Sequence, residues 1–304
     1  MIDLSLVQLR MLREVARRGT MAAAAGALGY TPSAISQQLA HLQQSAGVDL
    51  FERVGRNVHL TDAGYDLARR ADTILGEVEA AGAALESSRT DVRGVVHVGL
   101  FESVATALLP SLLTRLAADH PDLEVRTTLA DPGGAVDALS TGELALAFSL
   151  DYDGVPWPLP DRLRSDHLRD DPFHLVVPTG HRIADGPVHL GDVADERFIG
   201  SPPESPCGRL MMAACDAAGF RPDVVHRFDD YRTVLELVSA GHGISLVPEL
   251  GLCDVPSDVR VLPLAEPVVR RIVLTCRSAS ADRPAIAAVR HALCCALDDT
   301  LAAA

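Results

Sequence analysis

The chain of 304 residues contains no lysine, so every one of its 27 Lys/Arg positions is an arginine. Aromatic residues are also scarce, at 4%, whereas hydrophobic residues make up 48%. No apolar run reaches membrane-spanning length, and no basic segment followed by an apolar one stands at the N-terminus. This composition argues against a disordered chain and against a partner membrane. It is typical of a packed globular protein, which we expect in the cytoplasm.

Recognisable chemical motifs are missing as well. The six cysteines form no Cys-x-x-Cys pair, and none has a histidine at zinc-finger spacing. No Ser/His/Asp arrangement and no pair of carboxylates at a hydrolytic spacing stands out. We therefore expect buried thiols, no metal, no cofactor, no catalytic residues and no enzyme activity.

Charge is distributed unevenly along the chain. Residues 1–60 hold six arginines and four acids, so 6 − 4 = +2, whereas residues 61–304 hold 21 arginines and 37 acids, so 21 − 37 = −16. A mildly basic head on an acidic body indicates that the head alone meets a polyanion such as DNA.

The head predicts three helices separated by glycines. Apolar residues at three- and four-residue steps favour a first helix over residues 4–18. Thr20 is an N-cap for an alanine-rich helix over 21–28, and Thr31 followed by proline begins a third helix. Two helices joined by a short glycine-containing turn form a helix-turn-helix.

The third predicted helix presents polar side chains outward. Ile35, Leu39 and Leu42 form its inner face, which leaves Ser33, Ser36 and Gln37 exposed. Hydroxyls and amides of this kind suit base edges and phosphates. The alternative is an ordinary helical hairpin with a solvated face.

Residues 50–61 read as a β-hairpin. Val54 and Val58 flank a three-residue tip, Gly55-Arg56-Asn57, and Arg53 precedes it. A wing of this type carries arginine to the phosphates or into the minor groove of a duplex. Arg53 and Arg56 are therefore candidate DNA contacts.

A long helix is predicted over residues 61–87. Its apolar residues recur at steps of four and three, which is typical of a helix that pairs with a copy of itself. The alternative is a single amphipathic helix that packs on its own body. The seam consists of Leu67, Ala71, Ile74, Val78, Ala81 and Leu85.

From residue 94 onward, strands alternate with helices, which predicts parallel, doubly wound sheets in two α/β lobes. Predicted strands cover 94–100, 122–130, 144–150, 173–177, 196–200, 223–228, 243–247, 259–264 and 268–276. Predicted helices cover 103–119, 133–141, 206–218, 231–240 and 282–301. The Pro- and Asp-rich stretches at 151–160 and 170–172 are where a crossover between lobes is expected.

These segments together resemble the LysR-type transcriptional regulators. The resemblance rests on TPSAISQQLAHLQ, on LFERVGRNVHLT followed by DAG, on GVVHVGLFESVATALLPSLL, and on HPDLEV, TGELALAF and CDAAGFRPDV further along. It implies an α/β protein with an N-terminal winged helix-turn-helix, a long dimerising linker helix and a two-lobed effector domain similar to periplasmic binding proteins. It also implies a homodimer or homotetramer that binds double-stranded DNA and a small-molecule effector.

Domain limits and DNA contacts follow from the resemblance. The DNA-binding domain would span 1–60, the linker helix 61–89 and the effector domain 90–304, with lobe 1 at about 92–162 and 267–304 and lobe 2 at about 163–266. The residues placed at DNA would be Thr20, Thr31, Ser33, Ser36, Gln37, Arg53 and Arg56.

An effector is expected between the lobes, where strand ends and helix N-termini meet. The candidate binding residues are Phe101, Glu102, Ser103, Phe148, Ser201 and Ser205. Each serine has helix capping as its alternative role. Glu102 and Glu204 would disfavour a carboxylate effector and favour a cation or a neutral compound.

Two other functions stay open. Peroxide-sensing relatives form a disulfide in the region of Cys207 and Cys215, but eight residues along one helix span about 12 Å, whereas a disulfide tolerates about 7 Å between Cα atoms. The second is a cytosolic solute-binding protein or α/β enzyme whose N-terminal helices mediate assembly. It predicts no affinity for DNA.

Overall fold

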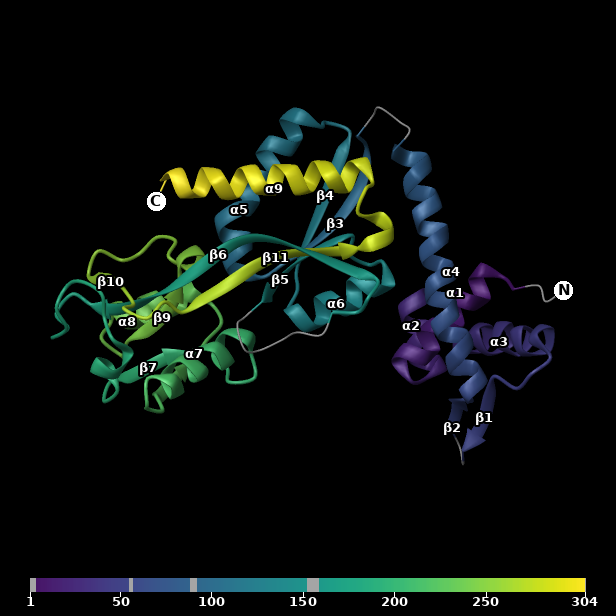
Figure 1. The fold of residues 1–304 in the computed structure, drawn as a ribbon, viewed down its shortest axis with the longest axis horizontal. Coiled ribbons are helices and arrows are strands. Elements are labelled where there is room, and N and C mark those ends of the chain that lie inside the picture. The colour runs from purple at the N-terminus through teal and green to yellow at the C-terminus, as the bar shows by residue number, and fades with distance from the viewer. Residues whose placement is uncertain (1–3, 55–56, 88–91, 152–158, 304) are drawn as a thin grey trace. The chain divides into compact units, whose positions relative to one another are not determined.

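The computed structural model describes residues 4–54, 57–87, 92–151 and 159–303 (Figure 1). The chain divides into two compact units, residues 1–89 and residues 90–304.

The first unit opens with the three predicted helices, and glycine ends each of them. Gly19, Gly29 and Gly47 adopt φ values of 75°, 69° and 71°, a left-handed conformation that glycine tolerates best. Oγ1 of Thr20 accepts from the Ala23 amide, so the predicted cap is confirmed. The helices are α1 (Leu6–Arg18), α2 (Met21–Leu28) and α3 (Pro32–Ala46).

The hairpin and the long helix complete this unit. β1 (Phe51–Val54) pairs antiparallel with β2 (Asn57–Leu60), and α4 (Asp62–Ser87) follows. The alanines of α2 let α3 approach closely, so that one small core forms beneath all these elements. Its buried members are Met11, Leu12, Val15, Ala24, Ala25, Ile35, Leu39, Leu42, Leu50, Leu60 and Ala68.

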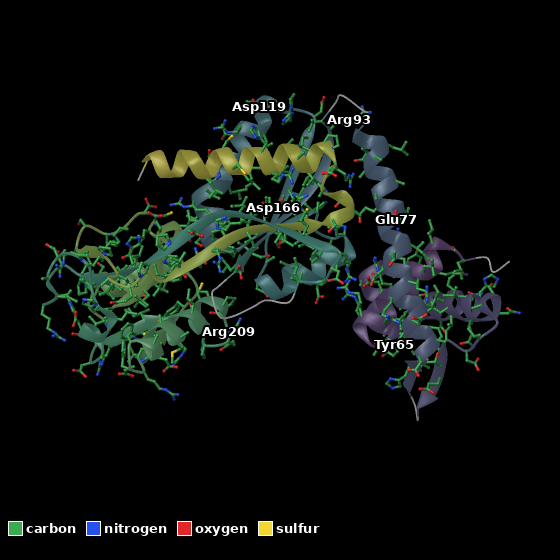
Figure 2. The ribbon with its side chains drawn as sticks, viewed as in Figure 1. Tyr65, Glu77, Arg93, Asp119, Asp166 and Arg209 are labelled. Atoms are coloured by element: carbon green, nitrogen blue, oxygen red, sulfur yellow. The ribbon has the colours of Figure 1, made fainter. Side chains whose placement is uncertain are left out.

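The apolar seam of α4 is divided. Leu67 packs on the core of the first unit and Ala71 is buried, so these two positions are already used within the chain. Farther along, Val78 is 45% exposed and Leu85 is 74% exposed. The polar side chain of Glu77 also lies on this helix (Figure 2). The exposed apolar side chains of the seam therefore lie on its C-terminal half.

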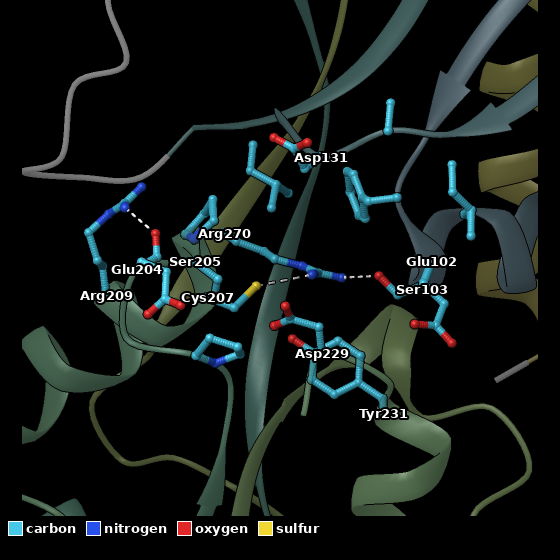
Figure 3. A pocket seen from close by; sticks show the side chains of 16 residues that line it. Glu102, Ser103, Asp131, Glu204, Ser205, Cys207, Arg209, Asp229, Tyr231 and Arg270 are labelled. Carbon is cyan, nitrogen blue, oxygen red and sulfur yellow. Dashed lines mark hydrogen bonds between the residues drawn. The ribbon is translucent and has the colours of Figure 1, made fainter. Parts of the chain in front are cut away.

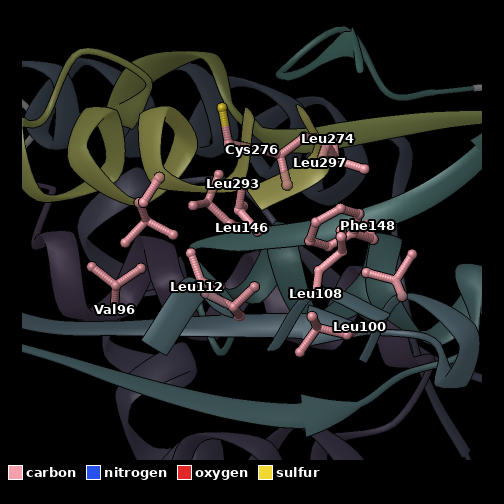
Figure 4. Close-up of a cluster of buried hydrophobic side chains, with 14 of the residues drawn as sticks. Val96, Leu100, Leu108, Leu112, Leu146, Phe148, Leu274, Cys276, Leu293 and Leu297 are labelled. Carbon is pink, nitrogen blue, oxygen red and sulfur yellow. The ribbon is translucent and has the colours of Figure 1, made fainter. Parts of the chain in front are cut away.

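The second unit is built on a seven-stranded mixed sheet. Strands β3 (Gly94–Leu100), β4 (Leu123–Leu129) and β5 (Leu146–Asp151) are parallel, as predicted. Helices α5 (Glu102–Asp119) and α9 (Pro284–Ala303) contribute to the core of this half, and α6 (Pro132–Thr141) follows β4. Figure 4 shows this core, in which Leu108, Leu146, Phe148 and Leu293 meet.

The other half of this unit has its own core around Phe198, Met211 and Leu246. It contains a parallel pair, β7 and β8, and two strands that join the large sheet, β9 and β10. The elements are β7 (Arg197–Gly200), α7 (Pro206–Ala217), β8 (Asp223–Arg227), α8 (Tyr231–Ser239), β9 (Ser245–Pro248) and β10 (Val259–Pro263).

Two long strands connect the halves, and their length and antiparallel pairing correct the sequence prediction. β6 covers Leu163–Pro178, whereas 173–177 was predicted, and it pairs antiparallel with β11 (Val269–Arg277), which also pairs antiparallel with β5. The sheet is therefore mixed, where parallel sheets were predicted. The stretch 170–172, where a crossover between lobes was expected, lies inside β6, and Asp171 of this stretch pairs with Arg270 on β11.

Candidate functional site

The outer face of α3 is polar and exposed. Ser33, Ser36 and Gln37 are exposed, whereas Ile35 and Leu39 on the inner face are 0% exposed. Oγ1 of Thr31 accepts from the Ala34 amide and lies 3.1 Å from Oγ of Ser33. The apolar face thus fixes the helix on the core while its hydroxyls and amides point to solvent.

The remaining predicted DNA contacts are described in part. Thr20 is exposed at the start of α2. The backbone of Arg53 pairs with Val58 in the hairpin, but its side chain lies outside the described residues. Arg56 also lies outside the described residues.

Two glutamines that the sequence reasoning missed hold α3 in place. Gln8 of α1 is buried, and its Nε2 donates to Oε1 of Gln38 at 3.2 Å and lies 3.0 Å from Nδ1 of His41. Oε1 of Gln43 accepts from the amides of Leu50 and Phe51, which joins α3 to the hairpin. The sequence does contain one signal for this contact, because Gln8 is a polar residue within the apolar face of the first helix.

A cavity of about 560 Å³ lies between the halves of the second unit. It forms where the N-terminal ends of α5, α7 and α8 come together, so that both halves and strand β11 contribute to its wall. Four predicted residues line it, namely Phe101, Glu102, Ser103 and Ser205.

The structure corrects the other two predicted effector residues. Phe148 is fully buried in the core, where its ring meets that of Phe101 edge-on at 6.5 Å, so it supports the cavity wall from behind. Ser201 is buried at the end of β7 and is not part of the lining. Neither side chain is therefore among those that line the cavity.

Arg270 on β11 is the central polar residue of the cavity, and it is 1% exposed. Its Nε donates to Oδ2 of Asp171 at 2.7 Å, and its Nη2 donates to Oγ of Ser103 at 2.7 Å. Nη1 lies 3.7 Å from Sγ of Cys207. Figure 3 shows the side chain extending between Cys207 and Ser103, which belong to opposite halves.

The ion pair with Asp171 explains why the guanidinium of Arg270 stays charged although it is buried. Burial opposes the charged guanidinium, but Asp171, Tyr231 and Cys207 together outweigh it and raise the pKa of Arg270. The guanidinium also lies 5.3 Å from the centroid of the Phe101 ring and 5.9 Å from that of Tyr231, within range of cation–π attraction. Arg270 therefore stays positive and bridges the two halves.

The sequence reasoning missed Arg270, Asp171 and Tyr231. Asp171 and Arg270 are register partners on β6 and β11 but stand 99 residues apart in the chain. The arginine gives no local signal, because charged residues at strand ends are normally exposed.

The helix ends around the cavity carry their own polar groups. Oγ of Ser205 accepts from the Gly208 amide and caps α7, so the predicted ligand residue is also a cap. Asp230 caps α8 through the Arg232 amide. Burial, together with Asp230 and Asp229, raises the pKa of Glu102 in the first turn of α5.

Cys207 and Cys215 lie on the same continuous helix, α7. Cys207 is half-buried and lines the cavity. Cys215 is fully buried in the core of its half, and this burial raises the pKa of its thiol to about 12. The two thiols therefore differ in their access to the cavity.

Two features are absent from the described residues, a membrane-spanning helix and a metal-binding cluster. No described helix is long and apolar enough to cross a membrane. No described group of three or more His, Cys, Asp or Glu side chains is arranged to hold a metal ion.

Known protein families match both units. Residues 6–65 match the bacterial regulatory helix-turn-helix protein family of LysR type, and residues 89–296 match the LysR substrate binding domain. The transcriptional dual regulator GltC of Bacillus subtilis is 30% identical, over 89% of this chain and 89% of that protein. A probable hydrogen peroxide-inducible genes activator of Mycobacterium leprae is also 30% identical, over 90% of this chain and 88% of that protein.

Solved structures share the fold. A mutant OxyR of Corynebacterium glutamicum aligns with a TM-score of 0.63 at 24% identity, covering 99% of this chain and 94% of that one. Full-length CbnR in complex with its target DNA aligns with a TM-score of 0.56 at 23% identity, covering 96% of this chain and all of that one. The chain belongs to the LysR family of DNA-binding transcriptional regulators.

Proposed function

We propose that this regulator reads DNA with the exposed face of α3 and responds to a small effector held in the cavity of its second unit. One observation carries the DNA assignment: Ser33, Ser36 and Gln37 are exposed above an inner face that is fully buried. A helix fixed in this way can enter a major groove without rearranging. The wing arginines, Arg53 and Arg56, are assigned to phosphates or the minor groove.

Pairing of two copies of the chain through α4 would supply the second α3 helix. Val78 and Leu85 remain exposed on the C-terminal half of the seam, where a second copy can cover them. Two copies would place their α3 helices in successive major grooves, about one helical turn apart on a pseudo-palindrome. We propose that the working form is a homodimer or homotetramer, that it acts in the cytoplasm, and that it has no catalytic role.

We propose that the effector changes how the two halves of the second unit are arranged relative to each other. Ser103 belongs to the first half and Cys207 to the second, and Arg270 contacts both. A ligand that prefers one arrangement of the halves shifts the population toward it. Changed spacing between paired copies then alters how the DNA is bent.

Substitutions on α3 and the wing test this proposal on DNA from the protein's own upstream region. Ser36→Ala removes a hydroxyl and is expected to weaken specific binding by about 1 kcal/mol. Arg53→Ala is expected to weaken binding to all DNA sequences equally. It should also reduce the slope of log K against log salt concentration by about 1, which corresponds to one counterion fewer released on binding. Gel shifts over a series of salt concentrations measure both effects.

Thr73→Ala on the exposed surface of α4 is the matched control, because it removes a hydroxyl away from the assigned face. It should bind like the wild type. Equal binding by the wild type, Ser36→Ala and Arg53→Ala would remove the assignment of helix and wing.

The position of Cys207 favours a second candidate, a redox-sensing regulator. The thiol lines the cavity beside the guanidinium of Arg270. A thiolate at Cys207 could attack hydrogen peroxide, breaking the O–O bond to give a sulfenic acid and hydroxide, and the hydroxide becomes water with the proton that the thiol released. The relative from Mycobacterium leprae is named as a peroxide-inducible activator.

Peroxide treatment followed by peptide mass spectrometry separates the two candidates. The second one predicts a sulfenic acid on Cys207 without a Cys207–Cys215 disulfide, because α7 is continuous between them and Cys215 is buried. A Cys207→Ser variant is the control for the assignment of the modified peptide. If Cys207 remains a thiol and DNA binding is unchanged by peroxide, the redox candidate is wrong.

A further inference from the structure

The cavity between the two halves carries more negative than positive charge. Four carboxylates line it, those of Glu102, Asp131, Glu204 and Asp229, together with two guanidiniums, those of Arg209 and Arg270 (Figure 3). The acids come from four separate segments of the chain, before or within α5, α6, α7 and α8. Their charges therefore surround the cavity.

The arginines are already engaged with the protein. Arg270 is neutralised by Asp171, and its Nη2 is directed to Ser103. Nη1 of Arg209 donates to the backbone carbonyl oxygen of Glu204. Among the described residues, only Arg270 is matched by a carboxylate, so the four carboxylates of the lining face a single uncompensated guanidinium, that of Arg209.

Helix N-termini usually attract anions, but here the chain fills that role itself. The hydroxyl of Ser205 accepts an amide of α7, and the carboxylate of Asp230 accepts an amide of α8. The first turn of α5 carries the carboxylate of Glu102. A ligand carboxylate would therefore meet one amide already bonded at α7, a carboxylate cap at α8 and a negative charge in the first turn of α5.

The carboxylates also crowd one another on one side of the cavity. Burial raises the pKa of Glu102, and the neighbouring Asp230 and Asp229 raise it further. Like charges held close together oppose ionisation, and a cation placed among them relieves this cost. The apolar part of the lining includes Phe101, Leu129 and Leu150.

We propose that the cavity takes a cationic, amine-bearing ligand with an apolar body. The ammonium group lies toward Glu102 and Asp229, and the body packs against Phe101 and Leu150. This inference rests on the proposed function only in taking the cavity as the effector site. It names the chemical class of the effector.

The native Cys207 thiol provides the readout, because it lines the same cavity. The full-length protein is alkylated with the neutral reagent N-ethylmaleimide, and modification of Cys207 is followed by peptide mass spectrometry. Three probes with the same phenyl ring and two-carbon arm are added in turn: 2-phenylethylamine, 2-phenylethanol and phenylacetate. The amine is expected to slow alkylation at a concentration at least tenfold lower than either of the other two.

Two double variants of equal net charge isolate the cavity. Glu102→Gln with Asp229→Asn should abolish the preference for the amine. Glu143→Gln with Asp216→Asn removes two exposed carboxylates outside the lining and should preserve it. Melting temperatures of both variants verify that they fold.

Protection by phenylacetate or 2-phenylethanol at the same or lower concentration than the amine overturns the inference. So does a lack of protection by all three probes up to about 10 mM, which corresponds to binding weaker than about 3 kcal/mol. Gel shifts without added probe test DNA binding separately. Retained DNA binding with the wrong ligand preference refutes the ligand class alone.

Discussion

Replacing Arg270 by glutamine is expected to lower the free energy of unfolding of the 90–304 unit by about 3–5 kcal/mol, because a buried carboxylate is left without its partner. Asp171 is 0% exposed, and Nε of Arg270 lies 2.7 Å from its Oδ2. The hydroxyl of Ser103 loses a donor in the same change. Urea unfolding followed by circular dichroism measures the loss, and hydrogen exchange of the β6 and β11 amides locates it.

The neighbouring residue on the same strand is the matched control. Arg271 pairs with Asp151 at 3.3 Å, but both side chains are partly exposed, so Arg271→Gln should cost at most about 1 kcal/mol. Combining Arg270→Met with Asp171→Leu removes both charges and should recover most of the lost stability. Equal losses in Arg270→Gln and Arg271→Gln would contradict the importance assigned to the buried pair.

The second large effect concerns Gly64 in the first turn of α4. A Cβ at this position would collide with the carbonyl oxygen of Leu50 and lie 2.7 Å from Cδ2 of Leu60. That carbonyl also accepts the amide of Thr61, so it cannot move away freely. We expect Gly64→Ala to destabilise the first unit by about 3 kcal/mol and to weaken DNA binding through the displaced hairpin.

Gly76 in the same helix is the control for Gly64. A Cβ there meets nothing within 4 Å, and alanine is the better helix former, so Gly76→Ala should be neutral or stabilising by up to about 1 kcal/mol. Thermal unfolding of the two variants compares them directly. A Gly64→Ala protein as stable as Gly76→Ala would show that α4 does not pack on the hairpin as described.

Local signals in the sequence were sufficient for the first unit. The caps at Thr20 and Thr31 and the stop at Gly29 depend on atoms within four residues, so the bounds of α2 were predicted without error. The face of α3 followed from helical periodicity alone, which is why Ile35 and Ser36 were assigned to the correct sides.

The second unit was less predictable because its key contacts are distant in sequence. The first half of β6 was not among the predicted strands, and only a crossover between lobes was expected at 170–172. Its strand pairing depends on β11, nearly one hundred residues later. Phe148 was expected to touch a ligand, but Phe101 lies between it and the cavity. A pattern of apolar residues in the sequence cannot show which of two neighbouring aromatic rings lines a cavity.

The exposed end of the α4 seam has a genetic consequence. Under the proposed pairing, a copy with a defective α3 but an intact Val78 and Leu85 still joins a normal copy through this helix. Each such mixed dimer has one intact α3 helix, whereas a pseudo-palindromic site requires two. A mutant allele expressed beside the intact one would therefore be dominant-negative, because its product forms mixed assemblies with wild-type subunits that bind the operator poorly.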